Sequence, residues 1–439
     1  MRAEITVTVA LRRSLSLSPA GAVRGTLAVP GDKSISHRYV MLGGSASGTT
    51  TITNLASGAD VAATVACITA LGAGVERGAD QALSITGRGA GGFIQPDTTL
   101  DAENSGTTLR LLSGLVASRP VRVTLTGDES LRRRPMQRVI DPLMAMGARI
   151  TSAGGRAPLV IEGGALQAID WRVPVASAQV KSAILFAGLG ARGTTVVREP
   201  LRTRDHTERA FPAFGLRILT EGTVLSVDGG QTPAAPAEML TVPGDPSSAA
   251  VWAALAAALP GSRVQIEGVC LNPLRLGFLA ALERMGARIR TEIVTESAGE
   301  PIGRLEVSHG DHVAAAIAAE EVPSLIDELP VLAARAALGG ALEVSGASEL
   351  RVKESDRITA LVSGLRAMGV TADERPDGFV IDGRRRPSGG AADAAGDHRL
   401  VMAFALVALG ATGPSVVTGA ESVAVSYPGF EQDLARLIR

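Results

Sequence analysis

Apolar stretches long enough for buried helices recur along the chain, and five of them end in the same way. A Leu, Met or Phe is followed by glycine and then by the first residue of an apolar, strand-like segment. Glycine directly after the last apolar position commonly stops a helix, because it accepts a left-handed backbone. The endings are Leu71–Ala73, Met146–Ala148, Phe214–Leu216, Met285–Ala287 and Met368–Val370. Their spacing of roughly 70 to 80 residues predicts repeats of one supersecondary unit.

The same order of elements precedes the endings. A polar segment opens an apolar helix, a glycine turn leads into a β-branched strand, and a second helix follows. These parts are Asp32–Ser45, Gly48–Asn54 and Ala59–Leu71 in the first copy, and Ser177–Gly188, Gly193–Arg198 and Arg204–Phe214 in the third. A last helix over Tyr427–Arg439 ends the chain. The pattern predicts one βαβαββ-like unit present six times.

Six polar segments open the first helices of these units. They are Gly31–Ser34, Glu103–Thr107, Ala176–Gln179, Gly244–Ser248, Ile326–Glu328 and Gly396–Arg399. Ser, Thr, Asn and Asp are usual N-caps, so capping explains much of their composition. Capping does not explain Lys33, Gln179 and Arg399 in the first turns, because positive charge there opposes the helix dipole. An anion bound at these helix ends would make such side chains favourable.

Composition narrows the class of protein. A length of 439 residues predicts two or more domains, and 46% hydrophobic with only 3% aromatic residues favours layered α/β structure. The net charge of −1 indicates no general attraction to nucleic acid or to an anionic membrane. Cys67 and Cys270 have no disulfide or zinc spacing and are predicted to be buried. No apolar run is long enough to span a membrane, and residues 1–21 are interpreted as an extension on a cytoplasmic protein.

Lysine occurs at only three positions, Lys33, Lys181 and Lys353, while about forty arginines carry the remaining positive charge. A guanidinium favours flat, two-pronged contacts, whereas an ammonium is a compact charge that reaches single oxygens. The three lysines therefore indicate places where arginine would not serve. A lysine-poor composition would also leave a few lysines at random positions, and the role of Lys181 stays open.

Six short motifs occur in the order found in one enzyme family. They are Gly31–Arg38 (GDKSISHR), Asn104–Arg110 (NSGTTLR), Arg134–Met136 (RPM), Ser177–Ser182 (SAQVKS), Arg351–Arg357 (RVKESDR) and Asp397–Arg399 (DHR). Over residues 24–435 the chain resembles the 5-enolpyruvylshikimate-3-phosphate synthases, also called 3-phosphoshikimate 1-carboxyvinyltransferases. Each motif alone is a weak signal, but six in order are specific.

The resemblance implies an α/β fold of two similar domains, each with three βαβαββ-type repeats whose helices lie inside and sheets outside. One domain would span residues 31–243, and the other would join residues 1–30 to residues 244–439. The family transfers the carboxyvinyl group of phosphoenolpyruvate to the 5-hydroxyl of shikimate-3-phosphate by addition and elimination, releasing phosphate, in the pathway to chorismate and the aromatic amino acids. It uses no metal or organic cofactor, and we expect a cytoplasmic monomer.

The resemblance also implies the substrate contacts. Shikimate-3-phosphate would be held by Lys33, Ser34, Arg38, Ser177, Ala178, Gln179, Arg204, Asp327 and Lys353. Phosphoenolpyruvate would lie against Lys33, Gly106, Arg134, Gln179, Arg357 and Arg399, because the arginine fork matches carboxylate and phosphate oxygens. Arg204 is alternatively a helix-end charge, and Arg134 is alternatively part of a generic basic run.

The candidates for acid-base and charge chemistry at the reacting atoms are Asp327, Glu354 and Lys33. A lone aspartate at a helix start is more often a cap than a base, but Asp327 matches the family residue beside the 5-hydroxyl. The sequence leaves open which carboxylate takes the hydroxyl proton and which group protonates C3 of phosphoenolpyruvate.

Two features depart from the pattern of many family members. Where these carry a lysine near the carboxyl terminus, this chain has Ala424–Pro428, which leaves open what replaces one cation for phosphoenolpyruvate. Ala178 stands where many members have serine, and with Arg204-Asp205-His206 it places the chain near the divergent second class. That class includes glyphosate-tolerant members, some with alanine at the position of Gly106. Glycine at position 106 therefore predicts a site that admits the inhibitor glyphosate.

The sequence also suggests alternative interpretations. The sister family that acts on UDP-N-acetylglucosamine has a reactive cysteine in the loop matching Asp128–Pro135, where this chain has none. Gly87–Gly92 satisfies the GxGxxG pattern of a nicotinamide enzyme. The residues that follow do not continue as a helix, as that pattern requires, so a hairpin turn is predicted. A non-catalytic anion-binding protein would bind both substrates without releasing phosphate. His309 and His312 form a lone HxxH, which we interpret as a solvated turn and not as a metal site.

Overall fold

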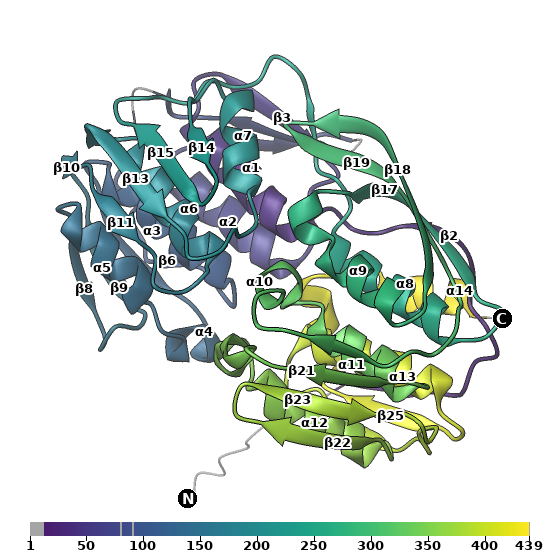
Figure 1. Cartoon of the computed structure of the whole chain (residues 1–439). Coiled ribbons are helices and arrows are strands. Elements are labelled where there is room, and N and C mark those ends of the chain that lie inside the picture. The colour runs from purple at the N-terminus through teal and green to yellow at the C-terminus, as the bar shows by residue number, and fades with distance from the viewer. Residues whose placement is uncertain (1–12, 80, 90–91, 439) are drawn as a thin grey trace, which may run out of the picture.

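The structure is a computed structural model that describes residues 13–79, 81–89 and 92–438. Its buried hydrophobic side chains form two cores. The first core is built from residues 35–242 with Cys270, and the second from residues 20–29 and 249–437. Figure 1 shows the purple-to-teal elements of the first core beside the green-to-yellow elements of the second. Residues 1–12 of the predicted amino-terminal extension lie outside the described residues.

Each repeat contributes one inner helix, and the inner helices pack against one another within each core. They are α1 (Lys33–Ser45), α3 (Gly106–Ala117), α6 (Ala178–Gly188), α8 (Pro246–Ala258), α11 (Leu329–Ala337) and α13 (His398–Gly410). Every residue of α8 and α13 is buried, as expected of helices surrounded by other elements. α3 and α6 approach so closely that a Cβ on Gly114 would lie 2.0 Å from the Ala183 carbonyl oxygen. Glycine is required at this contact.

The described part of the chain has eight further α-helices. The α-helices are α2 (Ala59–Ala70), α4 (Glu129–Arg133), α5 (Gln137–Ala145), α7 (His206–Ala213), α9 (Gly277–Arg284), α10 (Val322–Leu325), α12 (Arg357–Ala367) and α14 (Phe430–Leu437). Among the described residues there are also the 3-10 helices η2 (Pro273–Arg275), η3 (Ser348–Val352) and η4 (Ala420–Val425).

In the described residues, five four-stranded sheets share one topology: a parallel strand pairs with one side of a central strand, and an antiparallel hairpin completes the other edge. In the first core they are β16–β3–β5–β4 (Leu240–Thr241, Thr49–Thr53, Leu83–Thr86, Gly74–Arg77), β6–β7–β9–β8 (Leu100–Asp101, Arg122–Thr126, Leu159–Glu162, Arg149–Ser152) and β11–β13–β15–β14 (Asp170–Arg172, Thr194–Arg198, Val224–Asp228, Leu219–Glu221). In the second core they are β2–β17–β19–β18 (Arg24–Ala28, Arg263–Cys270, Glu300–Ser308, Arg288–Ser297) and β20–β21–β23–β22 (Ala315–Ile317, Ala341–Val344, Gly378–Asp382, Thr371–Arg375).

The sixth sheet, β24–β25–β1 (Ala391–Asp393, Ser415–Thr418, Ser14–Leu17), keeps the parallel pair but replaces the hairpin with the amino-terminal strand. A short parallel pair, β10–β12 (Leu166–Gln167, Ala191–Arg192), links two neighbouring repeats. Along the central strands β3, β7 and β13, buried residues alternate with more exposed ones. This alternation is typical of a sheet with one face on the helices and one face toward solvent. The predicted α/β fold with helices inside and sheets outside is confirmed.

Two first strands are exchanged between the cores. β2 precedes α1 in the chain but pairs with β17, and β16 precedes α8 but pairs with β3; Figure 1 shows β2 beside β17. The two crossings run side by side, because Asp32 N donates to Pro243 O at 2.7 Å and Asp245 N donates to Pro30 O at 2.8 Å. A Cβ on Gly31 would lie 1.9 Å from the backbone oxygen of Asn54, which directly follows β3, so glycine is required here too.

Most predicted boundaries agree with the structure within three residues. α1 begins one residue after Asp32, because the carboxylate of Asp32 caps the helix and accepts a hydrogen bond from Ile35 N. α7 begins at His206, two residues after the predicted start, and α14 begins at Phe430, three residues after the predicted start.

Two local predictions are wrong. Glu328 precedes α11 without a side-chain cap, since the chain enters α11 almost directly from α10, so Ile326–Glu328 is not a capping segment. β5 pairs with β3 and β4 and not with β6. The GxGxxG segment that follows β5 therefore connects two sheets and is not a hairpin turn. Ala90 and Gly91 lie outside the described residues, and no helix begins in the described stretch from Gly92 to β6.

Candidate active site

A pocket of about 430 Å³ lies between the two cores, at the amino-terminal ends of the inner helices. It is lined by Lys33 and Ser34 of α1, Gly106 and Thr107 of α3, Ala178 and Gln179 of α6, Ser247 of α8, Asp327 just before α11, and Arg399 of α13. A helix amino terminus carries partial positive charge and unpaired N–H groups. Six such termini around one pocket favour an anionic ligand.

Most charged side chains of the pocket are basic. Among the described residues that line it, eight are basic: Lys33, Arg110, Arg134, Arg138, Arg204, Arg275, Lys353 and Arg399. Five are acidic: Asp60, Asp245, Asp327, Glu349 and Glu354. The excess of positive charge suits small molecules that carry phosphate and carboxylate groups.

Lys33 is the first residue of α1, and its Nζ lies 2.9 Å from Oδ2 of Asp60 in the first turn of α2. Burial disfavours the charged lysine, but the carboxylates of Asp60 and Glu354 outweigh it and raise the pKa of Lys33. Lys33 therefore keeps its proton and acts as a fixed positive charge in the wall of the pocket.

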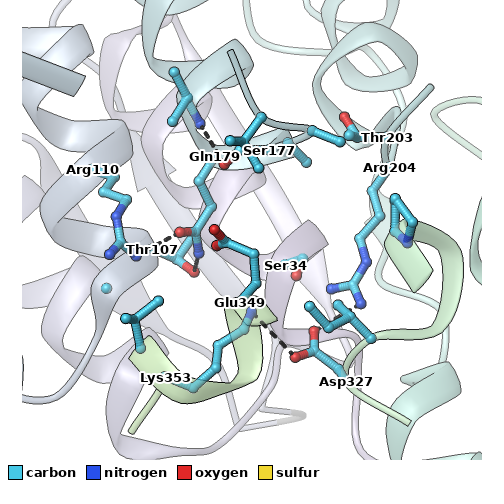
Figure 2. A pocket seen from close by; sticks show the side chains of 18 of the residues that line it. Ser34, Thr107, Arg110, Ser177, Gln179, Thr203, Arg204, Asp327, Glu349 and Lys353 are labelled. Carbon is cyan, nitrogen blue, oxygen red and sulfur yellow. Dashed lines mark hydrogen bonds and ion pairs between the residues drawn. The ribbon is translucent and has the colours of Figure 1, made fainter. Parts of the chain in front are cut away.

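Four cations surround the carboxylate of Asp327. Nη2 of Arg204 lies 2.8 Å from Oδ2, while Nη1 of Arg357 and Nζ of Lys353 lie 3.3 Å and 3.7 Å from Oδ1. Nη2 of Arg399 is 3.8 Å from Oδ2. Burial raises the pKa of this carboxyl, but the cations, led by Arg399, outweigh burial and hold the pKa well below its usual range. Figure 2 shows Arg204 and Lys353 approaching Asp327 from different sides.

Arg357 is buried behind the wall of the pocket, where it holds the acidic side chains in place. Its Nε lies 2.6 Å from Oδ2 of Asp397, and its two Nη groups pair with Glu354 and Asp327. Burial raises the pKa of Glu354, but Arg357 and then Arg134 outweigh it and hold the pKa well below its usual range. Glu354 is therefore an ionised side chain fixed by a buried arginine.

Gln179 is held by a short chain of hydrogen bonds that Figure 2 displays. Nη1 of Arg110 donates to its Oε1 at 2.7 Å, and its own Nε2 donates to the hydroxyl of Thr107 at 2.8 Å. A Cβ on Gly106, at the start of the same helix as Thr107, would lie 2.7 Å from Nη1 of Arg110. Gly106 therefore leaves the space that Arg110 occupies.

Arg134 lies in the short connection between α4 and α5. Its Nη2 donates to Oδ1 of Asn104 at 2.6 Å, and its Nη1 lies 3.8 Å from Oε1 of Glu354 in the second core. Arg132 and Arg133, the other members of the basic run, do not line the pocket. Of these three arginines, Arg134 alone lines the pocket.

Of the predicted site residues, all line the pocket except Arg38 and Arg357. Arg38 is a buried residue of α1, and its Nε donates to Thr207 at 2.7 Å while its Nη2 donates to Ser182 at 2.8 Å. Its Nη1 donates to the carbonyl of Ser34 at 2.8 Å. Both guanidinium groups therefore have internal partners, and the predicted contacts of Arg38 with shikimate-3-phosphate and of Arg357 with phosphoenolpyruvate stay predictions.

The sequence interpretation missed several pocket residues. Asp60 fixes Lys33 from the next helix, and its only sequence signal is an acidic residue in a first turn. Arg138 and Glu349 form an ion pair of 2.7 Å across the rim, from α5 to η3. Nothing in the sequence pairs these two residues, which are more than two hundred positions apart.

The cysteines and histidines take no part in the lining. Cys67 and Cys270 are both buried, as predicted. Nδ1 of His312 is 2.7 Å from Nη1 of Arg335, and Nδ1 of His309 is 3.0 Å from the carbonyl oxygen of Ala257. In the described part of the chain, no three His, Cys, Asp or Glu side chains are grouped so that they could hold a metal ion. Nor is any described helix long and apolar enough to cross a membrane.

The fold and the pocket together are those of an enolpyruvyl transferase-like protein. In this class of protein, the amino-terminal ends of inner helices from two cores enclose a pocket for anions. A family model described as EPSP synthase (3-phosphoshikimate 1-carboxyvinyltransferase) matches residues 17–434. The chain belongs to this family.

Two relatives named 3-phosphoshikimate 1-carboxyvinyltransferase illustrate the match. The protein of Desulfitobacterium hafniense (strain DSM 10664 / DCB-2) is 47% identical over 421 residues, which cover 95% of this chain and 96% of the relative. The protein of Acaryochloris marina is 46% identical over 425 residues, covering 95% and 94%. The predicted family is confirmed. The names of the relatives do not distinguish classes within it, so the position near the second class stays a prediction.

The comparison with solved structures agrees with this family assignment. The structure of EPSP synthase from Acinetobacter baumannii has a TM-score of 0.86 and 39% identity, and the match covers 97% of this chain and 98% of that one. The enolpyruvyl transferase NikO from Streptomyces tendae matches with a TM-score of 0.77 over 97% of this chain and 98% of its own. At 18% identity, the second match speaks for the fold alone.

Proposed function

We propose that the pocket between the two cores is the active site in which shikimate-3-phosphate and phosphoenolpyruvate react. The chain is a carboxyvinyltransferase: the carboxyvinyl group of phosphoenolpyruvate passes to the 5-hydroxyl of shikimate-3-phosphate, and phosphate is released. The reaction belongs to the shikimate pathway, which leads to chorismate and the aromatic amino acids. The observation that carries the assignment of the site is the meeting of the inner helix amino termini and eight basic side chains around the ionised Asp327 and Glu354.

Shikimate-3-phosphate is assigned to the side of the pocket formed by α1, α6 and the turn before α7. Its phosphate would lie at the amino terminus of α6 and near Arg204, where N–H groups and a guanidinium are available. Its ring and hydroxyl groups would face Lys33, Ser34, Asp327 and Lys353. The contact set is completed by Ser177, Ala178 and Gln179.

Phosphoenolpyruvate is assigned to the side formed by α3, the connection after α4, and α13. Arg134 and Arg399 would bind its carboxylate and phosphate, while Gly106 and Gln179 would form the wall of the pocket beside them. Arg110 holds Gln179 there and also faces the pocket, so we add it to this group. We assign Arg357 a positioning role, because its guanidinium fixes Asp327 and Glu354.

Asp327 is the proposed acceptor of the proton from the 5-hydroxyl. Surrounded by Arg204, Arg399 and Lys353, its carboxylate is ionised but weakly basic. The same cations are the proposed partners of the substrate anions, so substrate binding would draw positive charge away from Asp327 and raise its pKa toward that of an effective base. Lys33 keeps its proton and would stabilise negative charge where the two substrates meet. The reaction needs no metal or organic cofactor in this scheme.

We further propose that residues 31–243 form one domain and residues 1–30 with 244–439 form the other. The separate hydrophobic cores support this division. Because both halves of one chain line the pocket, a monomer suffices for activity. We expect the enzyme to work in the cytoplasm and to bind no nucleic acid.

Phosphate release in the presence of both substrates tests the proposal. We expect release that requires shikimate-3-phosphate and phosphoenolpyruvate together, and a loss of about a thousandfold in kcat for Asp327→Asn. UDP-N-acetylglucosamine in place of shikimate-3-phosphate serves as the control for the sister reaction. Turnover with that nucleotide sugar alone, or binding of both substrates without release of phosphate, would refute the proposal.

A further inference from the structure

Lys181 lies at the end of the first turn of α6, directly after the residues of that helix that line the pocket, but it does not line the pocket itself. Its side chain is only 1% exposed, and its Nζ is 2.9 Å from Oε2 of Glu199 and 2.7 Å from Oε1 of Glu208. The carbonyl oxygen of Thr203 is a third neighbour, at 3.5 Å. One buried ammonium therefore joins α6, the end of strand β13, the turn that follows it and the first turn of α7.

The chemistry of this cluster suits lysine and not arginine. An ammonium has three donors around one nitrogen, and here three oxygens surround it, whereas a guanidinium is a flat fork that needs more room. Burial raises the pKa of Glu208, while Lys181 acts in the opposite direction and favours its ionised form. Loss of the ammonium would leave two carboxyl groups buried side by side.

The segment that Lys181 fixes carries a residue of the pocket. Thr203 is held twice, since its carbonyl oxygen faces Lys181 and its hydroxyl donates to Oε1 of Glu199. The next residue is Arg204, whose guanidinium reaches across the pocket to Asp327 at 2.8 Å. A shift of the turn would therefore move Arg204 against its partner in the second core.

We propose that Lys181 is a positioning residue for shikimate-3-phosphate, which acts by holding the turn of residues 199–205 so that Arg204 meets both the substrate phosphate and Asp327. This rests on the proposed function, in which Arg204 binds that phosphate. Lys181 touches no substrate. It sets the place from which Arg204 acts.

A double-mutant cycle between Lys181→Met and Arg204→Ala tests this role. In the otherwise unchanged enzyme, Lys181→Met should raise the KM for shikimate-3-phosphate about tenfold and leave the KM for phosphoenolpyruvate within about twofold. In the Arg204→Ala background the same substitution should change the KM for shikimate-3-phosphate by less than about twofold, because the residue through which it acts is gone. A purely structural role would instead lower the active fraction equally in both backgrounds.

The matched control is Arg198→Met. Arg198 is a half-exposed cation on strand β13, next to Glu199, and its Nη2 pairs with Oδ2 of Asp170 at 2.8 Å outside the pocket. The Arg198→Met substitution should leave the KM for shikimate-3-phosphate and the KM for phosphoenolpyruvate unchanged. Should Lys181→Met fail to fold, Glu199→Gln keeps the shape of the cluster but removes one charge, and the same pattern is expected for it.

Unchanged KM for shikimate-3-phosphate in folded Lys181→Met or Glu199→Gln enzyme, or equal changes with and without Arg204, would overturn the inference. The unsubstituted enzyme separates this outcome from failure of the proposed function. If it releases no phosphate from the two substrates, the function is wrong. If it turns over normally and the cycle shows no coupling, only the role of Lys181 is wrong.

Discussion

At the scale of single residues, two lysines of the pocket have opposite electrostatic surroundings. Burial lowers the pKa of Lys33, but the nearby carboxylates outweigh burial, so the pKa is raised. Around Lys353, burial and then Arg357 and Arg204 outweigh the attraction of Asp327, so its pKa is lowered. Lys33 stays charged, whereas Lys353 loses its proton at a lower pH than a solvated lysine does.

This difference predicts an alkaline limb in the pH profile. A lysine with a lowered pKa is charged below that pKa and neutral above it, so kcat/KM should fall on the alkaline side as Lys353 loses its proton. The profile of kcat/KM between about pH 7 and pH 10 reports ionisations of the free enzyme. Lys353→Arg should keep its charge and move the limb to higher pH. An unmoved limb in that variant would assign it to another group.

The space beside Gly106 gives a second prediction. In Gly106→Ala the new methyl group would lie 2.7 Å from Nη1 of Arg110 and 3.4 Å from Nη1 of Arg134. Both are flexible ends, so the arginines should shift, Arg110 should lose its bond to Gln179, and the KM for phosphoenolpyruvate should rise by about tenfold, or about 1.4 kcal/mol. The inhibition constant for glyphosate should rise as well. Equal inhibition constants for the two proteins would remove the hypothesis that glycine admits the inhibitor.

Twelve of the residues that line the pocket were predicted from the sequence. Unfavourable charge or polarity at helix starts indicated Lys33, Gln179 and Arg399, and the other nine came from the resemblance of the motifs to the family. The motifs do not show that Arg38 and Arg357 are buried beside internal partners, which lie far from them in the sequence. Asp60 was missed because a first-turn acid is common in ordinary helices. Long-range partners of this kind depend on packing between repeats.

At the scale of elements, helix caps prepare the pocket. Side-chain oxygens of Asp32, Ser105, Ser177, Asp245 and Asp397 accept backbone hydrogen bonds at the starts of five of the inner helices. Each cap fixes where its helix begins, and therefore which residues of the first turn reach the pocket. α11 lacks such a cap, and there the carboxylate of Asp327 is left to bind cations.

Ser105 tests this role of the caps. It is buried, and its hydroxyl accepts from Thr108 N at 3.1 Å. Ser105→Ala should lower the free energy of unfolding by about 1 kcal/mol and the Tm by about 2 to 4 °C. Ser118→Ala, at the other end of the same helix, is the matched control in a thermal unfolding series. Equal shifts in the two variants would show that the cap contributes little.

The repeat order was visible in the sequence because glycine stops and β-branched strands have strong local signals. The pairing of the first strands was not. β16 has two residues and β6 has two residues, so neither has a periodicity to recognise. Their partners are chosen by the geometry of the finished sheet, as with β2, which pairs with a strand more than two hundred residues away.

At the scale of the whole molecule, charge across the pocket couples the two cores. The lining carries more basic than acidic side chains, and these come from both cores. Like charges facing each other oppose approach, and anionic substrates between them remove this repulsion.

Small-angle scattering should therefore detect closure. On addition of shikimate-3-phosphate we expect the radius of gyration to fall by about 1 Å from about 22 Å, the size of a compact chain of this length. Sodium chloride at matched ionic strength controls for screening. The same scattering curve with and without the substrate would contradict closure driven by charge.

The exchange of β2 and β16 also bears on how the protein is made. On the ribosome, the first three repeats emerge before residues 240–241, and their opening sheet cannot gain its parallel strand until then. β2 waits for β17, and β1 waits for β25, which is synthesised almost last. β1 thus keeps an unpaired edge until late in translation, when strands from near the two ends of the chain pair in the second core.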